Sequence, residues 1–196
     1  MPPARGDHEA RRADVSEAVW QVLAAKGLSG LTLRAVAAQM SASTGLLTHY
    51  FPTKRALVRH ALAVAEERTA ARARRRPEAD GLAALRVTLL DVLPLTPEGI
   101  VMNRVWVSSW GASLTDPELG RVESARLARW RTTLHAHAVA ARELGELPEA
   151  SDPADVVASA TAFTHGLVVH ALFDPEGFPP ERQTALLEEF LHGLRG

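Results

Sequence analysis

Three short segments in the C-terminal half place a helix-capping residue directly before proline: Thr96 in "TPEG", Asp116 in "TDPEL" and Asp152 in "SDPAD". The side-chain oxygen of such a residue accepts hydrogen bonds from backbone N–H groups of the first turn, and proline is favoured at the first helical position. An acidic residue follows each proline within one turn, where the helix dipole favours negative charge. Each segment therefore predicts the start of a helix.

No segment shows the alternation of apolar and polar residues that marks a strand, because valine and isoleucine are scattered among alanine, leucine, arginine and glutamate. Since 46% of the 196 residues are hydrophobic, the chain can bury a sizeable core. We therefore predict an all-α fold of about nine helices. The expected helices span residues 8–26, 32–40, 43–49, 53–76, 78–93, 98–113, 116–144, 152–173 and 180–194.

Charge is divided unevenly along the chain, although the net charge is only −1. Residues 1–80 carry 13 Lys and Arg against 8 Asp and Glu, whereas residues 81–196 carry 9 against 15. No acidic residue lies between Glu17 and Glu66. A segment without carboxylates suits a polyanionic partner such as nucleic acid, although a short Ala- and Leu-rich stretch can also lack acids by chance.

Several functional classes are excluded by missing motifs. The absence of cysteine removes disulfides, thiolate chemistry and cysteine zinc sites. The start "MPPARGDHEARR" has no apolar run that would make a secretory signal, and no uncharged apolar stretch approaches the roughly 20 residues that span a membrane. The histidines are not spaced for one helix face, and no Gly-rich phosphate loop or "GxSxG" is present. We expect a cytoplasmic protein that is not an enzyme and binds no metal or cofactor.

Residues 31–51 resemble two short helices joined by a tight turn, the arrangement of a helix-turn-helix. The second helix of this motif enters the major groove of DNA by its N-terminal end. The apolar residues expected inside are Leu33, Val36, Ala37, Met40, Leu46, Leu47 and Phe51. The small polar residues and the histidine left outside are Thr44, Gly45, Thr48 and His49.

The stretch "LTLRAVAAQMSASTGLLTHYFPTKRAL" resembles the DNA-binding domain of the TetR family of one-component repressors, and "HYFPTKRAL" is a close match to the family's pattern. The resemblance covers about residues 8–60. It implies an N-terminal three-helix DNA-binding domain at 1–52, a connecting helix at 53–76 and a larger regulatory domain at 77–196. The residues that it assigns to DNA are Thr32, Arg34, Ser43, Thr44, Gly45, Thr48, His49, Tyr50 and Lys54.

The sequence departs from the family's pattern at Thr48 and in the turn, and Tyr50 has two possible roles. The family commonly has tyrosine where Thr48 stands, so the resemblance does not say which bases are read here, and the threonine methyl can meet a thymine methyl. The Gly-Val usual in the turn is Ser41–Ala42. Tyr50 is either a phosphate contact, with Lys54 one turn on, or a core residue, and we favour the phosphate contact.

The C-terminal half resembles the BetI-like branch of the family through "RVWVSSW", "DPEL", "ARWR", "HGL" and "LFDP". The resemblance implies a helical domain that dimerises and holds a small inducer. Tryptophans at helical spacing either line such a pocket or pack a core, and paired tryptophans can cage a quaternary ammonium group. The candidate pocket residues are Asn103, Trp106, Trp110, Trp130, His135, Phe163 and His165.

The last two expected helices carry broad apolar stripes, which bury against either a second copy or the chain's own core. We predict a homodimer interface that includes Val168, Leu172, Leu187, Phe190, Leu191 and Leu194. A symmetric dimer would place two recognition helices on a near-palindromic operator in double-stranded DNA. The alternative is a helical adaptor that binds only protein, which salt-dependent DNA binding would distinguish.

Overall fold

The computed structural model describes residues 5–71 and 80–195, and within these ranges it contains helices and no strand. The helices are α1 (Arg5–Lys26), α2 (Leu33–Gln39), α3 (Thr44–Tyr50), α4 (Lys54–Ala71), α5 (Leu82–Leu90), α6 (Pro97–Thr115), α7 (Pro117–Glu143), α8 (Pro153–Phe173) and α9 (Pro180–Gly193). The all-α prediction is confirmed, with boundaries that differ by a few residues. The expected end of the helix at 53–76 and the domain boundary after it lie in 72–79, outside the described residues.

The predicted capping residues mark helix starts in the structure. Thr96 accepts a hydrogen bond from the backbone N–H of Gly99, at 3.1 Å, and opens α6. Asp116 opens α7 and Asp152 opens α8, each with its carboxylate on N–H groups of the first turn. These starts are set locally, because a side-chain acceptor satisfies N–H groups that have no partner within the helix.

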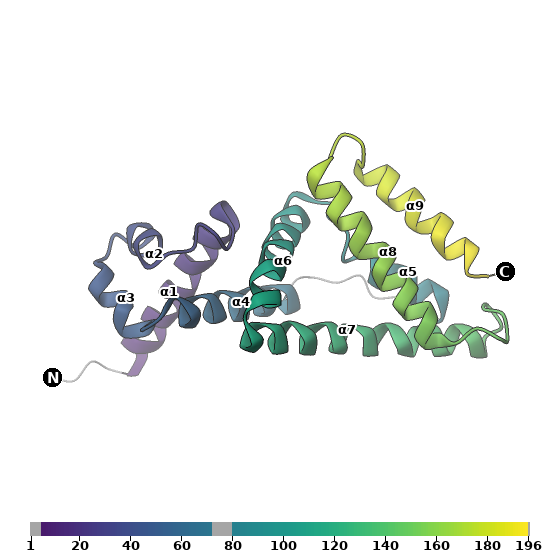
Figure 1. Ribbon diagram of the computed structural model, residues 1–196, viewed down its shortest axis with the longest axis horizontal. Coiled ribbons are helices and arrows are strands. Elements are labelled where there is room, and N and C mark those ends of the chain that lie inside the picture. Colours follow the sequence, from purple (N-terminus) through teal and green to yellow (C-terminus); the bar gives the residue numbers. More distant parts are fainter. Residues whose placement is uncertain (1–4, 72–79, 196) are drawn as a thin grey trace. The chain divides into compact units, whose positions relative to one another are not determined.

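The chain divides into two compact units, which we describe separately. Unit 1 comprises Met1–Arg72 and Arg104–Gly111 of α6. Within it α1 packs against α2 and α4, and α2 packs against α3 (Figure 1). Its core includes the aliphatic residues Val19, Leu23, Leu31, Val36, Leu47 and Leu57.

Part of α6 belongs to unit 1, which the sequence did not indicate. Trp106 of α6 is 8% exposed, and its Nε1–H donates to Thr69 Oγ1 of α4 at 3.3 Å. A β-carbon on Gly27, which ends α1 at a φ of 63°, would lie 3.9 Å from Ser108 Oγ. This segment of α6 therefore belongs to unit 1 because it packs against residues far away in the sequence, and no local signal predicts that packing.

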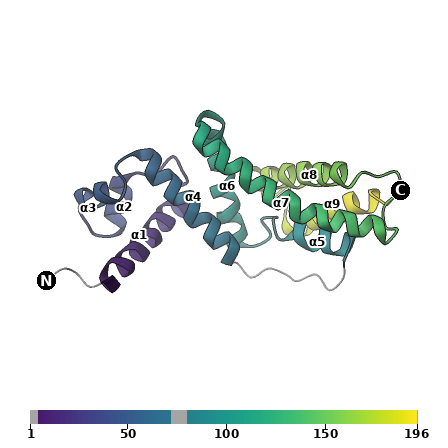
Figure 2. The same ribbon diagram turned by 90° about the horizontal axis from the view of Figure 1, so that it is seen from below.

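Unit 2 comprises Ala73–Asn103 and Ala112–Gly196. Helix α7 packs against α5 and α8, and α9 packs against α5 and α8 (Figures 1 and 2). Its core includes Leu85, Leu89, Leu93, Leu134, Leu167 and Leu187. Unit 2 is thus a layered helical unit with its own hydrophobic centre.

Helix α8 corrects one expectation from the sequence. By length and composition it is apolar enough to cross a membrane, whereas no such stretch was expected. Its buried residues include Val156, Val157, Leu167 and Val168, and it packs against α7 and α9. The apolar character of α8 is accounted for by its place inside a helical unit.

Candidate nucleic-acid interface and ligand site

Each helix of the helix-turn-helix begins at a hydroxyl cap, and the turn between them contains one left-handed residue. Thr32 Oγ1 accepts from the Ala35 N–H at 3.1 Å, and Ser43 Oγ accepts from the Leu46 N–H at 3.4 Å. Ser41 lies between the helices with a φ of 51°. Because each cap uses a hydroxyl oxygen as the acceptor, each hydroxyl hydrogen can still be donated to a phosphate.

The outward face of α3 is polar and open. Its exposed residues are Ser43, Thr44, Gly45, Thr48 and His49. A β-carbon on Gly45 would meet only Ser43 Oγ, at 3.8 Å, so packing inside unit 1 does not require glycine here. Thr48 Oγ1 donates to the Thr44 carbonyl at 3.0 Å, which leaves its lone pairs and its methyl outward. This face can therefore approach a large partner closely.

Buried residues hold that face in position. Leu47 is 0% exposed and Phe51 is 5% exposed, as the apolar pattern predicted. Phe51 also contacts the His60 ring of α4, with centroids 5.1 Å apart. Tyr50 is half-buried, with its ring edge-on to His49 at 6.0 Å. Helix α3 is thus fixed to α4 by its C-terminal end.

The remaining predicted DNA-binding residues flank α3. Arg34 in α2 and Lys54, the first residue of α4, are exposed. Thr53 caps α4 through the Ala56 N–H at 3.1 Å. An exposed cation at each side of a polar helix end is the arrangement that contacts two backbone phosphates.

In unit 2 the structure brings two predicted pocket residues together. The rings of Trp130 in α7 and His165 in α8 lie 5.1 Å apart at 34°. Trp130 Nε1 and the hydroxyls of Thr161 and Thr164 are buried with no hydrogen-bond partner among the described residues. Sequence reasoning missed the two threonines, because a hydroxyl on a helix gives no signal of being buried.

An ion pair lies beside this group. Arg126 donates to both carboxylate oxygens of Glu123, at 2.8 and 2.6 Å, and Glu123 is 9% exposed. Burial, above all, lowers the pKa of His165, the charge of Arg126 lowers it further and Glu123 opposes both. We call Glu123, Arg126, Trp130, Thr161, Thr164 and His165 the α7–α8 polar cluster. The His165 imidazole is neutral near pH 7, and the unpaired hydroxyl and indole groups of the cluster can bind a polar molecule.

The other candidate pocket residues have partners elsewhere. Asn103 Nδ2 donates to the carbonyls of Val92 and Gly99, both at 2.9 Å, and so joins α6 to the preceding loop. Phe163 stacks on Phe190 with centroids 4.5 Å apart. His135 is exposed on α7, and Trp106 and Trp110 fall in unit 1.

The predicted dimer residues fall into two groups. Val168, Leu187 and Leu191 are 1%, 0% and 5% exposed, so they already pack inside unit 2. Leu172, Phe190 and Leu194 are partly exposed. Among the described residues no group of three or more His, Asp or Glu side chains is placed to hold a metal ion.

Two family models match the chain. Residues 16–61 match the model described as bacterial regulatory proteins, tetR family, and residues 81–196 match that described as BetI-type transcriptional repressor, C-terminal. The chain is 27% identical over 176 residues to the HTH-type transcriptional regulator PksA of Bacillus subtilis, covering 88% of this chain and 84% of that protein. It is 31% identical over 138 residues to the HTH-type transcriptional regulator BetI of Paraburkholderia phytofirmans, covering 68% and 70%.

Solved structures share the fold. A transcriptional regulator from Rhodococcus sp. RHA1 aligns with a TM-score of 0.79 and 25% identity over 93% of this chain and 94% of that one. A regulator from Saccharomonospora viridis, crystallised in complex with choline, aligns with a TM-score of 0.81 and 21% identity over 94% and 96%.

Proposed function

Since this chain belongs to the TetR family of bacterial transcriptional regulators and carries a BetI-type C-terminal domain, we propose that it is a homodimeric repressor that a small molecule releases from its operator. Regulators of this family bind DNA, and the relatives are regulators rather than enzymes. We assign DNA binding to 1–52, the connection to 53–76, regulation and dimerisation to 77–196, and the whole protein to the cytoplasm.

The observation that carries the operator assignment is the outward face of α3. Thr44, Thr48 and His49 are exposed there, whereas Leu47 and Phe51 anchor the opposite side. The stretch from Ala18 to Ala65 contains no carboxylate that would repel a phosphate. A helix held in this way can lie in a major groove while Thr32, Arg34, Tyr50 and Lys54 contact the backbone on either side.

For the inducer, the supporting observation is the α7–α8 polar cluster. A buried hydroxyl or indole N–H without a partner is costly, and a ligand oxygen would remove that cost. We therefore expect an inducer that combines apolar bulk with hydrogen-bond acceptors. Choline is the first compound to compare, because the Saccharomonospora viridis regulator was crystallised with it.

Operator binding is tested by titrating the protein with DNA from immediately upstream of its own gene, with non-specific competitor, across a salt series. We expect specific binding that weakens steeply with salt. Lys54→Ala should weaken binding to all sequences and reduce the salt slope by about one, whereas Thr44→Ala should weaken binding at the operator. Arg131→Ala is the control, because Arg131 is an exposed residue of α7. Unchanged affinity in both variants would contradict this docking, and no binding at any salt would favour the protein-binding adaptor.

The ligand assignment has a matched pair of variants. Thr164→Val removes a buried, unpaired hydroxyl, whereas Thr132→Val removes an exposed hydroxyl that bonds the Ala128 carbonyl at 3.0 Å. Choline and a panel of small carboxylates would be screened for release of the operator complex. A compound that acts here should lose potency by about tenfold in Thr164→Val and little in Thr132→Val. Equal potency in both variants would place the inducer elsewhere.

A further inference from the structure

A pocket of about 440 Å³ opens in unit 1, whereas the α7–α8 polar cluster belongs to unit 2. Its lining comes from two helices and the end of α3: Arg12 and Val15 of α1, Tyr50 and Phe51, and Ala56, Arg59, His60 and Ala63 of α4. Its volume falls in the range of small-molecule sites, roughly 300–1,000 Å³. No role assigned above uses this pocket as a whole.

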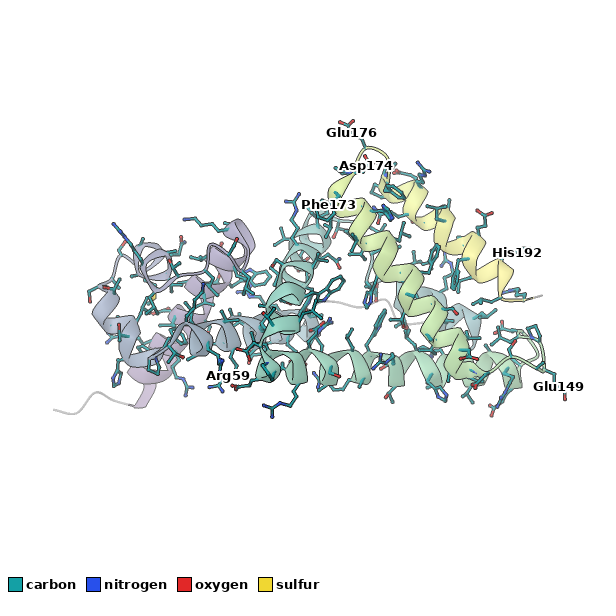
Figure 3. All side chains as sticks on the ribbon, in the orientation of Figure 1. Arg59, Glu149, Phe173, Asp174, Glu176 and His192 are labelled. Atoms are coloured by element: carbon teal, nitrogen blue, oxygen red, sulfur yellow. The ribbon has the colours of Figure 1, made fainter. Side chains whose placement is uncertain are left out.

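The lining has the chemistry of an anion site. Two guanidinium groups, Arg12 and Arg59, line the pocket, its described lining residues include no carboxylate, and Figure 3 shows Arg59 extending from α4. A guanidinium presents two parallel N–H groups that match a carboxylate or a phosphate. Tyr50 and Phe51 add aromatic surface, with ring centroids 6.4 Å apart. A ligand with both an anionic group and a ring would use each feature.

His60 ties this pocket to the rest of unit 1. Its Nε2 lies 3.1 Å from Ser16 Oγ of α1, and its ring lies 5.1 Å from that of Phe51. Burial, above all, lowers its pKa, Glu67 opposes this shift and Arg12 adds to it. The imidazole is therefore neutral near pH 7, and it offers a hydrogen-bonding group without repelling the arginines.

We propose that this pocket binds a small aromatic anion, an aryl carboxylate or an aryl phosphate, and that the bound anion weakens operator binding directly. Its charged group contacts Arg12 and Arg59, and its ring packs on Tyr50 and Phe51. Tyr50 belongs to both the pocket and the proposed DNA-contacting surface. A ligand that packs on the Tyr50 ring therefore holds the ring in one orientation, and DNA binding requires another. Coupling is reciprocal, so the operator must weaken the binding of the anion by the same factor.

The direct test measures the binding of two probes, phenyl phosphate and benzoate, to the full-length protein by calorimetry. Benzyl alcohol lacks the charge and inorganic phosphate lacks the ring, so both should bind more weakly. Arg12→Gln should weaken binding of the aromatic anion by about tenfold. Arg11→Gln is the matched control, because Arg11 is the exposed neighbour of Arg12 and does not line the pocket.

A second pair of variants blocks the pocket. Ala63→Glu places a carboxylate at the lining, whereas Ala70→Glu places one on exposed α4 outside it. We expect binding to be lost in the first and kept in the second. The proposal is overturned by no saturable binding up to on the order of 10 mM, or by equal losses in each pair.

Operator release provides the second readout, and it rests on the proposed DNA-binding function. Phenyl phosphate should release operator from the wild type and from Thr164→Val, but not from Ala63→Glu. Loss of the effect in Thr164→Val would move the site to the α7–α8 polar cluster and overturn the inference. A different outcome is that Arg12→Gln weakens operator binding while no probe binds the protein. That result would assign the pocket to the DNA-contacting surface and would also overturn the inference. Calorimetry does not depend on an operator, so its outcome stands if the proposed function fails.

Discussion

Ser41 has a φ of 51°, in the left-handed region that costs an L-residue about 1 kcal/mol and costs glycine far less. The TetR resemblance puts glycine at this position of the turn. The serine is therefore a site of local backbone strain between Met40, the C-cap of α2, and Ser43, the N-cap of α3. At this scale the backbone angle explains why the family prefers glycine.

Replacing Ser41 tests that explanation. Ser41→Gly should be neutral or stabilising by a few tenths of a kcal/mol, since relief of strain is offset by the greater entropy of glycine in the unfolded chain. Ser41→Val should destabilise the fold by more than about 1 kcal/mol, because a β-branched side chain fits the left-handed region poorly. Urea unfolding measures both. A destabilised Ser41→Gly would show that the serine side chain, rather than the backbone, fixes the turn.

The half-buried His60 predicts a dependence of stability on pH. Because burial lowers its pKa in the folded chain, both states are neutral above about pH 6.5 and the free energy of unfolding is at its highest there. As pH falls below that value, the unfolded chain binds a proton that the folded chain resists, so stability falls until the pH reaches the folded-state pKa. The groups around the ring are Ser16, Phe51, Arg12 and Glu67.

His60→Gln keeps a hydrogen-bonding group for Ser16 and removes the titration. Unfolding in urea from pH 8 to pH 5 should show a shallower loss of stability in this variant than in the wild type. Some loss should remain, since burial also lowers the pKa of His165. Parallel curves for the two proteins would contradict the assignment to His60.

At the scale of the element, local signals and distant contacts determine different helices. The starts of α6, α7 and α8 were predicted because Thr96, Asp116 and Asp152 act within one turn of sequence. The start of α5 was placed less well. It begins after Gly81, and the Leu82 N–H donates to Glu146 Oε2 at 2.7 Å, a carboxylate 64 residues away. No local pattern can reveal a cap supplied from the segment that follows α7.

The residues of the candidate sites also differ in whether local sequence or distant packing determines their exposure. The polar face of α3 follows from helical spacing around Leu47, so sequence alone predicted which residues it exposes. The α7–α8 polar cluster was only partly predicted, because Trp130 and His165 were candidates but the burial of Thr161 and Thr164 depends on how α7 and α8 pack. The pocket of unit 1 was missed, since its lining joins α1 to α4.

The cap of α5 gives a prediction for Gly81. This residue has a φ of 69°, and a β-carbon on it would lie 2.1 Å from Glu146 Oε2. Gly81→Ala should therefore lower the free energy of unfolding by about 2 kcal/mol, from left-handed strain plus loss of the cap. Gly145→Ala is the control, because it has a similar φ of 72° but nothing within 4 Å of the added carbon. Equal losses in both would show that the Glu146 contact contributes little.

At the scale of the whole molecule, the proposed function requires that two copies act together on one operator. Half of the predicted interface, Val168, Leu187 and Leu191, already lies in the core of unit 2 and holds α8 and α9 in place. The partly exposed residues Leu172, Phe190 and Leu194 are the ones left to meet a second copy. The buried residues therefore hold α8 and α9 in position, and we propose that the partly exposed residues contact the second copy.

That division can be tested with a charge at the exposed positions. A double variant, Leu172→Glu with Leu194→Glu, should be a folded monomer, because burying two unpaired carboxylates at an interface costs several kcal/mol. A monomer reaches one half-site, so its operator affinity should fall by about 100-fold or more. Sedimentation and operator titration measure the two effects. Leu114→Glu is the control, since Leu114 is 87% exposed on α6 and outside the proposed interface. A double variant that stays dimeric would place the interface elsewhere, and a monomer with full affinity would contradict the need for two copies.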